Sequence, residues 1–399
     1  MAEFDQDLEL RLNTIREQGL DRELRRVDSP QGTRIEIAGR TLINFSSNDY
    51  LGLANHPALK EGATRAVEKF GAGSGSARLI CGSLAPHHEL EERLAAFKGT
   101  EAALTFSSGY ATALGTISAL LDKDDIIIVD KLVHACIVDA ARLSGAKLRV
   151  FKHNDLDDLK RILRWAKTNS GNARNATRIL IVTESVFSMD GDAAPLAGMV
   201  VLKEIYGSWL MVDEAHATGL YGANRRGMAE ELGVADQIEI QMGTLGKALG
   251  ASGGYICGSR KLIDLLINRA RSFIFSTAPV PAAAAAAAAA IGLVQSHAGE
   301  ERRRLLWQRV NELRAKLAIS DSNWASAIIP ILVGDEMKAM KLAATLRAQG
   351  LFIPAIRYPT VSRGSARLRV TLTAAHTSND VSHLFEALKT AGCKPQTAN

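Results

Sequence analysis

The sequence predicts an α/β protein with a mostly parallel sheet of seven strands, followed by a smaller C-terminal α+β domain. Short apolar runs alternate with helical patterns, as they do in repeated βα units. Most of these runs are apolar at every position, which is typical of strands buried on both faces of a parallel sheet. After an alanine-rich stretch the pattern changes. The seven apolar runs are Ala102–Ser107, Asp125–Asp130, Lys147–Phe151, Arg178–Thr183, Trp209–Asp213, Ile238–Met242 and Gly254–Gly258.

The 399 residues are expected to form three regions. Residues 1–45 are expected to form a helix and a short extended arm, residues 46–289 the large domain, and residues 290–399 the small domain. Helical patterns over Ala111–Leu121 and Leu156–Lys167 fit between the strands of the large domain. Its last two strands are joined too briefly for a long crossover, so one of them is expected to run antiparallel. In the small domain, helices are expected after the first and third of three strands, Ala327–Gly334, Leu351–Ile356 and Ala366–Leu372.

Composition argues against several classes of protein. The net charge of +5 is mild and no long basic run carries interleaved aromatic residues, so nucleic acid is not an expected partner. The four cysteines are far apart and form no Cys-x-x-Cys pair, which predicts neither a metal site nor a disulfide framework. A reducing cytoplasm fits this cysteine usage. The acidic N-terminus also lacks the basic start and apolar core of a signal peptide.

One uncharged segment is long enough to cross a membrane. From Ser272 to Gly299 there is no Asp, Glu, Lys or Arg, and Ala282–Ala290 is a run of alanines. Alanine is only weakly apolar, however, and Pro279 and Pro281 interrupt the start. Alanine also has the highest helix propensity and lets a neighbouring backbone come close. We therefore expect a tightly packed helix of a soluble protein and no membrane span.

A single lysine lies in a glycine-rich and apolar stretch, "GTLGKALGASGGY" (Gly243–Tyr255). A phosphate-binding P-loop would need a glycine six positions before Lys247 and a Ser or Thr after it, where this chain has Gln241 and Ala248. A dinucleotide fingerprint fails as well, because the sixth residue of "GAGSGS" is Ser76. Two interpretations are left open. Lys247 either packs its stem and keeps its ammonium in water, or carries an aldehyde cofactor as a Schiff base, which apolar surroundings favour by lowering the pKa of lysine.

The residues that follow the expected strands suit the second interpretation. In open α/β sheets the ligand lies beyond the C-terminal ends of the strands. Asp213 ends one strand and could pair with a pyridine nitrogen, while His216 could meet a ring hydroxyl. The segment from Ser108 to Tyr110 opens a helix directly after a strand, where backbone N–H groups bind phosphate, and Thr244 lies near the lysine. His134 could cover the ring. This set of residues indicates pyridoxal 5'-phosphate.

Most of these residues lie in motifs that resemble the α-oxoamine synthases, pyridoxal-phosphate enzymes of the type I transferase fold. These motifs cover residues 40–285 almost continuously. They are "NFSSNDYLGLANHP" (Asn44–Pro57), "RLICGS" with "HHELEERLAAF" (Arg78–Phe97), "FSSGYATA" (Phe106–Ala113), "TESVFSMDGDAAPL" (Thr183–Leu196), "VDEAHATG" (Val212–Gly219), "GTLGKALG" (Gly243–Gly250) and "FSTAPVP" (Phe275–Pro281).

The resemblance implies a role for each matching residue. Lys247 would hold the cofactor and move a substrate proton, Asp213 would pair with the pyridine nitrogen, and His134 would stack on the ring. His216 and Ser188 would bond the ring oxygen. Around the cofactor would lie Gly109, Tyr110 and Thr244.

Further roles implied by the resemblance concern the substrates and a second subunit. Thr277 would reach the phosphate held by a partner subunit, which makes a homodimer with shared active sites expected. Asn48 and Arg369 would hold the carboxylate of the amino acid. Arg22, or else Arg25, would face the far carboxylate of an acyl chain. Thr360 would contact substrate.

Within the family, "IIPILVGD" (Ile328–Asp335) and "AIRYPTVSRGSARLRVTLTAAH" (Ala355–His376) are most similar to members that condense L-alanine with a pimeloyl thioester. The acyl group would arrive on CoA or on acyl carrier protein, and the sequence leaves both open. The main alternative is a member that uses glycine, such as a glycine C-acetyltransferase. A partner subunit that has lost catalysis is a further alternative, and the presence of Lys247, Asp213 and His134 argues against it.

The chain departs from the family pattern at several positions. Glu214 stands where the family usually has a second Asp, Ala217 replaces a usual Gly, and Tyr358 stands where a Pro is common. Ser76-Ala77-Arg78 replaces Gly-Ser-Arg, and Asp21 replaces a tyrosine that is common before Arg22. None of these changes removes a catalytic role.

Overall fold

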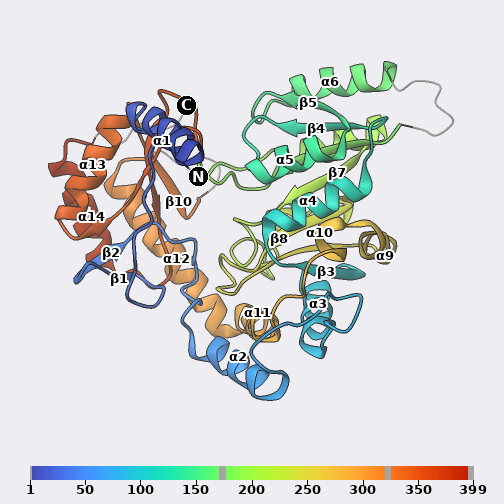
Figure 1. Cartoon of the computed structure of the whole chain (residues 1–399), viewed down its shortest axis with the longest axis horizontal. Coiled ribbons are helices and arrows are strands. Elements are labelled where there is room, and N and C mark those ends of the chain that lie inside the picture. The colour runs from blue at the N-terminus through green and yellow to red at the C-terminus, as the bar shows by residue number, and fades with distance from the viewer. Residues whose placement is uncertain (1, 170–176, 320–324, 394–399) are drawn as a thin grey trace. The chain divides into compact units, whose positions relative to one another are not determined.

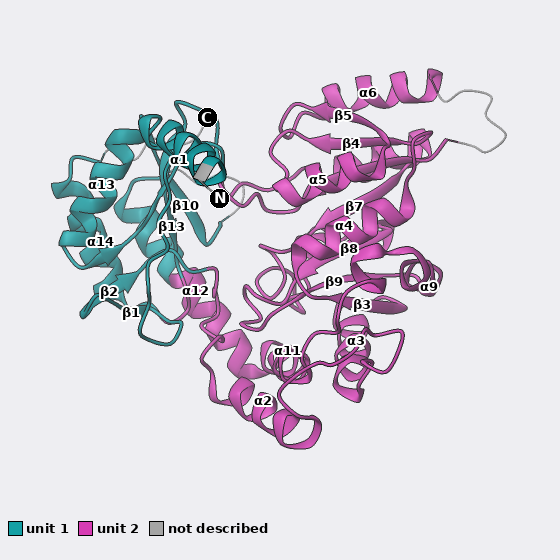
Figure 2. Cartoon of the chain, in the orientation of Figure 1, with its two compact units in different colours: residues 1–47, 309–372, 376–399 teal, residues 48–308, 373–375 magenta. Residues whose placement is uncertain are grey.

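The structure is a computed structural model that describes residues 2–169, 177–319 and 325–393. The chain forms two compact units (Figure 2). Unit 1 contains residues 1–47, 309–372 and 376–399, and unit 2 contains residues 48–308 and 373–375. These units part near residues 48 and 309, whereas the sequence predicts region boundaries at 46 and 290.

Unit 2 is built on one seven-stranded sheet in the order β3-β9-β8-β7-β6-β4-β5 (Figure 1). The strands from β4 to β8 pair in parallel, and β9 runs antiparallel to both β3 and β8. The α/β class, the seven strands and the antiparallel strand are as predicted. The strands are β3 Ala102–Phe106, β4 Ile126–Asp130, β5 Lys147–Phe151, β6 Ile179–Glu184, β7 Trp209–Asp213, β8 Ile240–Thr244 and β9 Gly254–Gly258.

Strand β8 begins and ends two residues later than the sequence predicts. Residues Ala235–Gln237 form a 3-10 turn, and the N–H of Ile238 still donates to the carbonyl of Ala235 at 3.3 Å. The hydrogen bond that closes the turn therefore uses Ile238, which local hydropathy assigns to the strand. As a result Thr244, a predicted cofactor residue, is the last residue of β8 and lies opposite Gly254.

Helices connect these strands and complete the unit. They are α2 Pro57–Phe70, α3 Ala85–Lys98, α4 Gly109–Leu120, α5 Ala135–Ser144, α6 Leu156–Thr168, α7 Leu196–Tyr206, α8 Met228–Glu231, α9 Arg260–Arg269, α10 Arg271–Ile274, α11 Pro281–Gln295 and α12 His297–Lys316, which passes into unit 1.

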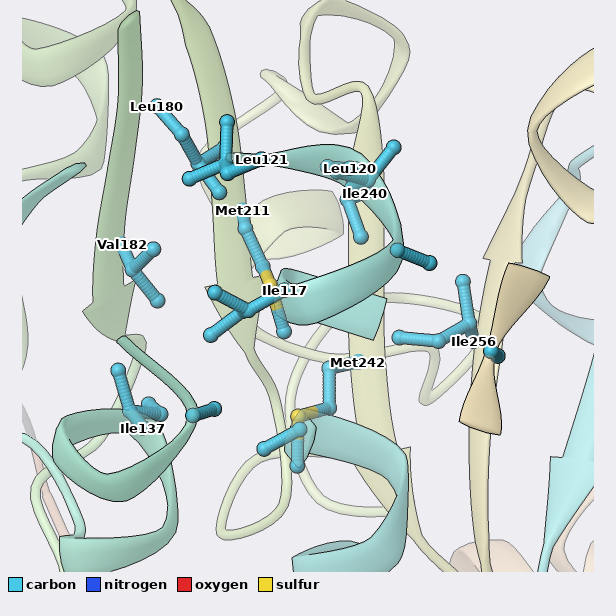
Figure 3. Packing of buried hydrophobic residues seen from close by; sticks show 14 of the residues in the cluster. Ile117, Leu120, Leu121, Ile137, Leu180, Val182, Met211, Ile240, Met242 and Ile256 are labelled. Carbon is cyan, nitrogen blue, oxygen red and sulfur yellow. The ribbon is translucent and has the colours of Figure 1, made fainter. Parts of the chain in front are cut away.

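The core on one face of the sheet holds α4 against the strands. Ile117, Leu120 and Leu121 at the end of α4 pack with Met211 of β7 and Ile240 of β8 (Figure 3). All of these side chains are at most 6% exposed. Burial of large aliphatic side chains contributes roughly 1.5–3 kcal/mol each. This packing fixes α4 against the sheet, while the Ser108 side chain caps its start next to Gly109.

The alanine-rich segment forms the packed helix α11. Ala284, Ala287 and Ala290 are buried, and a Cβ added at Gly62 of α2 would lie 3.2 Å from the carbonyl oxygen of Ala285. Small side chains on both helices thus allow a close approach. Among the described residues, no helix alone is long and apolar enough to cross a membrane. The pair α11 and α12, bent by 76° at its break, meets the length and composition criteria together.

Unit 1 joins the two ends of the chain. It holds helix α1 Ala2–Glu17 and two three-stranded sheets, in the orders β1-β2-β11 and β10-β13-β12. The expected strand Leu351–Ile356 is divided: Phe352 pairs with β2 and Ala355 with β13, on either side of Pro354, which has no N–H to donate. The remaining elements are β1 Arg34–Ile37, β2 Arg40–Asn44, β10 Ile328–Gly334, β11 Leu351–Phe352, β12 Ala355–Ile356, β13 Ala366–Thr371, α13 Glu336–Ala348 and α14 Ser378–Thr390.

Candidate active site

Lys247 lies in a tight loop directly after β8. Gly250 has φ +61°, and a Cβ at this position would lie 2.5 Å from the backbone nitrogen of Ala54. Only glycine permits both this conformation and this approach. The glycines of the loop therefore allow it to fold against the turn that follows Asn48, and the side chain of Lys247 remains half-buried.

The side-chain nitrogen of Lys247 meets a histidine. Its Nζ is 2.7 Å from Nε2 of His216, and Nδ1 of His216 is 2.5 Å from the hydroxyl of Tyr50. The Tyr50 hydroxyl is also 3.3 Å from Oδ1 of Asn48. His216 and Tyr50 are buried. Sequence reasoning did not single out Tyr50, although it lies within the quoted motif "NFSSNDYLGLANHP" and shares a turn with the predicted Asn48.

Two carboxylates end neighbouring strands. Glu184 of β6 and Asp213 of β7 are paired in register, and both are buried. Burial raises the pKa of Glu184 to about 8, and the nearby Asp213 adds to this, while Lys247 opposes it. Burial also raises the pKa of Asp213, against the attraction of Lys247 and a hydrogen bond from the N–H of Ala215. Glu184 lies at the end of an apolar strand and within the motif "TESVFSMDGDAAPL", but the sequence alone assigned it no role.

Glu184 also connects this pair to Ser188. Its Oε2 accepts a hydrogen bond from the backbone N–H of Ser188 at 3.2 Å, whereas its Oε1 is buried without a hydrogen-bond partner in the described part of the chain. A buried unsatisfied oxygen costs about 1–3 kcal/mol. Such a cost is tolerated at functional sites, where a ligand or a proton can satisfy the group.

His134 presents its ring at the start of α5. Its Nδ1 accepts a hydrogen bond from the N–H of Cys136 at 3.2 Å, which caps the helix and orients the ring, while the residue itself is exposed. Partial burial lowers the pKa of His134, and Lys247 lowers it further, against the attraction of Asp213. A largely neutral ring can lie flat against an aromatic ligand.

The start of α4 lies beside the end of β8. The hydroxyl of Ser108 accepts a hydrogen bond from the N–H of Ala111 at 3.1 Å and so caps the helix. A Cβ added at Gly254 would lie 2.8 Å from Gly109, and one added at Gly109 would lie 3.8 Å from Cβ of Thr244. These glycines bring the helix start next to the Thr244 hydroxyl. A helix N-terminus with nearby hydroxyls is a favourable site for a phosphate.

Two other predicted residues lie on the surface of unit 2. Tyr110 is exposed, and its hydroxyl donates to Oδ2 of Asp139 at 2.6 Å. Thr277 is exposed as well and forms an isolated antiparallel bridge with Ala77.

The predicted acyl-chain residues meet in unit 1. A cavity of about 600 Å³ is lined by Arg22, Arg25 and Thr360, together with Leu24 and other apolar side chains. The guanidinium of Arg357 donates to the carbonyls of Gly19 and Asp21, which ties this arm to the strand region. Arginines next to an apolar lining suit an aliphatic chain with a terminal carboxylate.

Arg369 and Asn48 belong to different compact units and are described separately. Arg369 is buried in β13, opposite Pro330 of β10, and its Nη1 donates to the hydroxyl of Thr371 at 3.1 Å. Asn48 lies in the turn of unit 2 that carries Tyr50.

The departure at Glu214 has a structural explanation. Its carboxylate accepts hydrogen bonds from the N–H groups of Met228 and Ala229, at 2.9 and 2.8 Å, and from the hydroxyl of Ser185 at 3.1 Å. The longer side chain reaches the first turn of α8, where the orphan N–H groups of a helix favour an anion. Glu214 therefore has a structural role beside Asp213.

The donor set of unit 2 fits pyridoxal phosphate. The lysine beside a histidine matches the aldehyde, and the buried acid matches the ring nitrogen. The accessible imidazole matches the ring face, and the helix start with its threonine hydroxyl matches the phosphate. Among the described residues, no group of three His, Cys, Asp or Glu side chains could hold a metal ion.

Comparison with known proteins identifies relatives of the whole chain. A family model described as aminotransferase class I and II matches residues 40–388. The 8-amino-7-oxononanoate synthase of Geotalea daltonii is 48% identical over 399 residues, which is 99% of this chain and 98% of that protein. A protein of the same name from Geobacter sulfurreducens is 48% identical over 96% of both chains.

Solved structures give the same result. Serine palmitoyltransferase from S. paucimobilis, with a bound pyridoxal-phosphate–myriocin adduct, superposes with a TM-score of 0.88 at 29% identity, covering 98% of each chain. The 8-amino-7-oxononanoate synthase of Francisella tularensis superposes with a TM-score of 0.73 at 28% identity, covering 88% of this chain and 97% of its own.

Proposed function

Because the chain belongs to the aminotransferase class I and II family, we propose that it uses pyridoxal phosphate to condense L-alanine with a pimeloyl thioester. The products are 8-amino-7-oxononanoate, CO2 and the free thiol, as in biotin biosynthesis. One observation carries the proposal: Lys247 Nζ lies 2.7 Å from His216 at the sheet edge where Asp213 is buried. The relatives reported above carry the name of this activity and do not favour the alternative that uses glycine.

When bound, pyridoxal phosphate supplies an aldehyde that can condense with an amine and a ring that withdraws electrons from the amino-acid carbon. Lys247 would hold the cofactor and carry the α-proton of alanine, with His216 as its hydrogen-bonded neighbour. Asp213 would hold the proton on the ring nitrogen, and a cation there would offset the cost of burying its charge. His134 would cover the ring face.

Further residues would hold the phosphate and the ring oxygen. The start of α4 at Gly109, with Tyr110 and Thr244 beside it, would hold the phosphate. Ser188, whose backbone is bonded to Glu184, would join His216 at the ring oxygen.

The substrates would be held by charge complementarity. Asn48 and Arg369 would bind the carboxylate of alanine. Arg22, with Arg25 as the alternative, would bind the far carboxylate of the pimeloyl chain in the cavity that Thr360 also lines. A bidentate arginine contact to a carboxylate contributes both affinity and orientation.

A homodimer with shared sites is part of the proposal. Leu79, Ile80 and Phe275 are 49%, 81% and 69% exposed and lie close in sequence to the bridge between Ala77 and Thr277. Apolar side chains this exposed favour burial against another surface. A second copy would cover them and bring its Thr277 to the phosphate. The four cysteines are free, which accords with the cytoplasmic location we propose.

A spectroscopic experiment tests the proposal. The visible absorption of the purified holoprotein is recorded during titration with L-alanine or glycine, and then with pimeloyl-CoA or pimeloyl-acyl carrier protein. We expect the cofactor band to respond to L-alanine, and the acyl donor to give turnover. A response confined to glycine would favour the alternative activity. In the Lys247→Ala variant we expect no covalent cofactor and no turnover, and retained turnover would contradict the role of this lysine.

A further inference from the structure

Tyr50 is a buried titratable group for which no role has been given, and only His216 separates it from the reactive lysine. It lies at the far end of a three-member chain, with its hydroxyl 2.5 Å from Nδ1 of His216 and Lys247 Nζ 2.7 Å from Nε2 on the other side of the ring. We propose that Tyr50 is a positioning residue that holds His216 in the tautomer with its proton on Nε2, directed at Lys247 and at the ring oxygen of the bound cofactor. This inference rests on the proposed use of pyridoxal phosphate.

The backbone holds the Tyr50 side chain in place. Its N–H donates to the carbonyl of Asn48 at 2.8 Å, and its carbonyl accepts from the N–H of Ala374 at 2.8 Å. The neighbouring Asp49 accepts hydrogen bonds from Leu53 and Ala54 at 2.7 and 3.2 Å, which closes the turn. The ring of Tyr50 meets that of His216 edge-on, with centroids 6.0 Å apart. The hydroxyl is therefore directed at His216 before any ligand binds.

A neutral imidazole has one donor and one acceptor nitrogen, so the chain has two self-consistent arrangements. In the first, Tyr50 donates to Nδ1, and Nε2–H donates to the neutral amine of Lys247. In the second, Nδ1–H donates to Tyr50, whose own proton goes to Oδ1 of Asn48, and Nε2 accepts from the ammonium of Lys247.

The distances favour the first arrangement. A donor–acceptor distance of 2.5 Å fits an O–H donor better than an N–H donor, whose hydrogen bonds are about 2.7–3.2 Å long. The contact from the Tyr50 hydroxyl to Oδ1 of Asn48 is longer, at 3.3 Å, so the shorter contact with Nδ1 of His216 is the better place for the Tyr50 proton. In the first arrangement Lys247 is neutral, as a nucleophile must be, and Nε2–H can donate to a ring oxygen once the cofactor is bound.

The Tyr50→Phe variant tests this inference in the holoprotein without substrate. A donor to the ring oxygen stabilises the unprotonated Schiff base, so loss of the Tyr50 hydroxyl raises the pH midpoint of the visible absorbance change. We expect an upward shift of about 0.5–1 pH unit, the equivalent of one hydrogen bond. The titratable groups that interact with Lys247, namely Asp213, Glu184 and His134, are unchanged in this variant.

Tyr255→Phe is the matched control. Tyr255 is fully buried in β9, and its hydroxyl lies 2.8 Å from the hydroxyl of Thr218. It is therefore outside the chain formed by Tyr50, His216 and Lys247. We expect the pH midpoint of the absorbance change in Tyr255→Phe to equal that of the wild type. In a His216→Asn background, Tyr50→Phe should cause no further shift, because the hydroxyl acts through His216. An unchanged midpoint in Tyr50→Phe, or an equal shift in the His216→Asn background, would overturn the inference.

A second measurement needs no variant of Tyr50. The ring 15N chemical shifts of His216, identified by their loss in His216→Asn, report which nitrogen carries the proton. We expect Nδ1 to be unprotonated at neutral pH, and a proton on Nδ1 would overturn the inference. A wild-type protein without any cofactor band would instead contradict the proposed function, so the two failures are distinguishable.

Discussion

Glu184 and Asp213 lie side by side at the ends of β6 and β7, two buried carboxyl groups paired in register. Two acids so close cannot both be charged without a compensating cation, and burial raises the pKa of both. The pair thus favours a positively charged ligand group at this edge of the sheet. Several measurements can test this and other features of the site.

The cofactor-free Glu184→Gln variant tests the buried acid. The pKa of Glu184 is raised from 4.5 to about 8, so the folded protein binds more protons than the unfolded chain between these values. The stability contributed by the neutral acid is fully present below pH 4.5 and is lost as pH rises through 8. Glutamine removes this dependence. We compare the free energy of unfolding of Glu184→Gln with that of the wild type. Relative to the wild type, we expect the variant to be about 2–4 kcal/mol more stable at pH 8.5 than at pH 5.

Urea unfolding of both cofactor-free proteins at the two pH values checks this expectation. Glu89→Gln, a change at an exposed glutamate of α3, serves as the control and should follow the wild type. An identical pH dependence of Glu184→Gln and wild type would show that Glu184 is charged in the folded protein.

His153 should show a pH dependence at a higher range. Its ring is 2.9 Å from Oδ1 of Asp130 and 2.7 Å from Oδ2 of Asp192. Burial lowers its pKa, but these two carboxylates outweigh burial and raise the pKa from 6.5 to about 10. The stability that protonated His153 contributes to the folded protein is therefore fully present below pH 6.5, and it is lost as pH rises through 10.

We expect the free energy of unfolding of His153→Gln to be about 2–3 kcal/mol below that of the wild type at pH 6, and much closer to it at pH 10.5. Because Asp192 is in the loop that carries Ser188, the variant should also bind pyridoxal phosphate more weakly. Chemical denaturation and cofactor titration measure the two effects. His297→Gln, at an exposed position, is the matched control, and a loss of equal size at both pH values would contradict a charged His153.

Arg22→Ala tests the acyl-chain cavity. We expect KM for the pimeloyl thioester to rise about 10- to 150-fold, with little change in the binding of L-alanine, because a charged hydrogen bond contributes about 1.5–3 kcal/mol. Arg25→Ala made in parallel decides between the two candidates. Arg26 pairs with Asp28 and is not among the described residues that line the cavity, so Arg26→Ala is the control. Equal losses for alanine and the thioester would give Arg22 a different role.

Glu214→Asp restores the residue that is common in the family. The shorter side chain cannot reach the N–H groups of Met228 and Ala229, so we expect a loss of about 1–3 kcal/mol in the free energy of unfolding. The absorption band of the bound cofactor should not move, since Asp213 is unchanged. Thermal and urea denaturation measure the loss. Unchanged stability would mean that the loop before α8 adjusts to the shorter side chain.

Much of the fold follows from local pattern. The bounds of β7 and β9 agree with the apolar runs, because a strand buried on both faces is apolar at almost every position. The bounds of β5 agree as well, although this edge strand is mostly exposed and carries Lys147 and Arg149. The same pattern identified residues after strand ends, such as Asp213 and Thr244, as candidates for a site. Local pattern failed where a neighbouring turn or a proline competed, as at the start of β8 and at Pro354.

By itself, then, the sequence determined the α/β class, the order of the strands along the chain and the residue types available at each strand end, since these depend on local periodicity. Only the tertiary structure decided which distant residues meet. Tyr50 and Lys247 are on opposite sides of His216, Glu184 lies beside Asp213, and β2 pairs with β11 across some 300 residues. Such contacts depend on how strands pair and helices pack in three dimensions, and no short stretch of sequence carries that information.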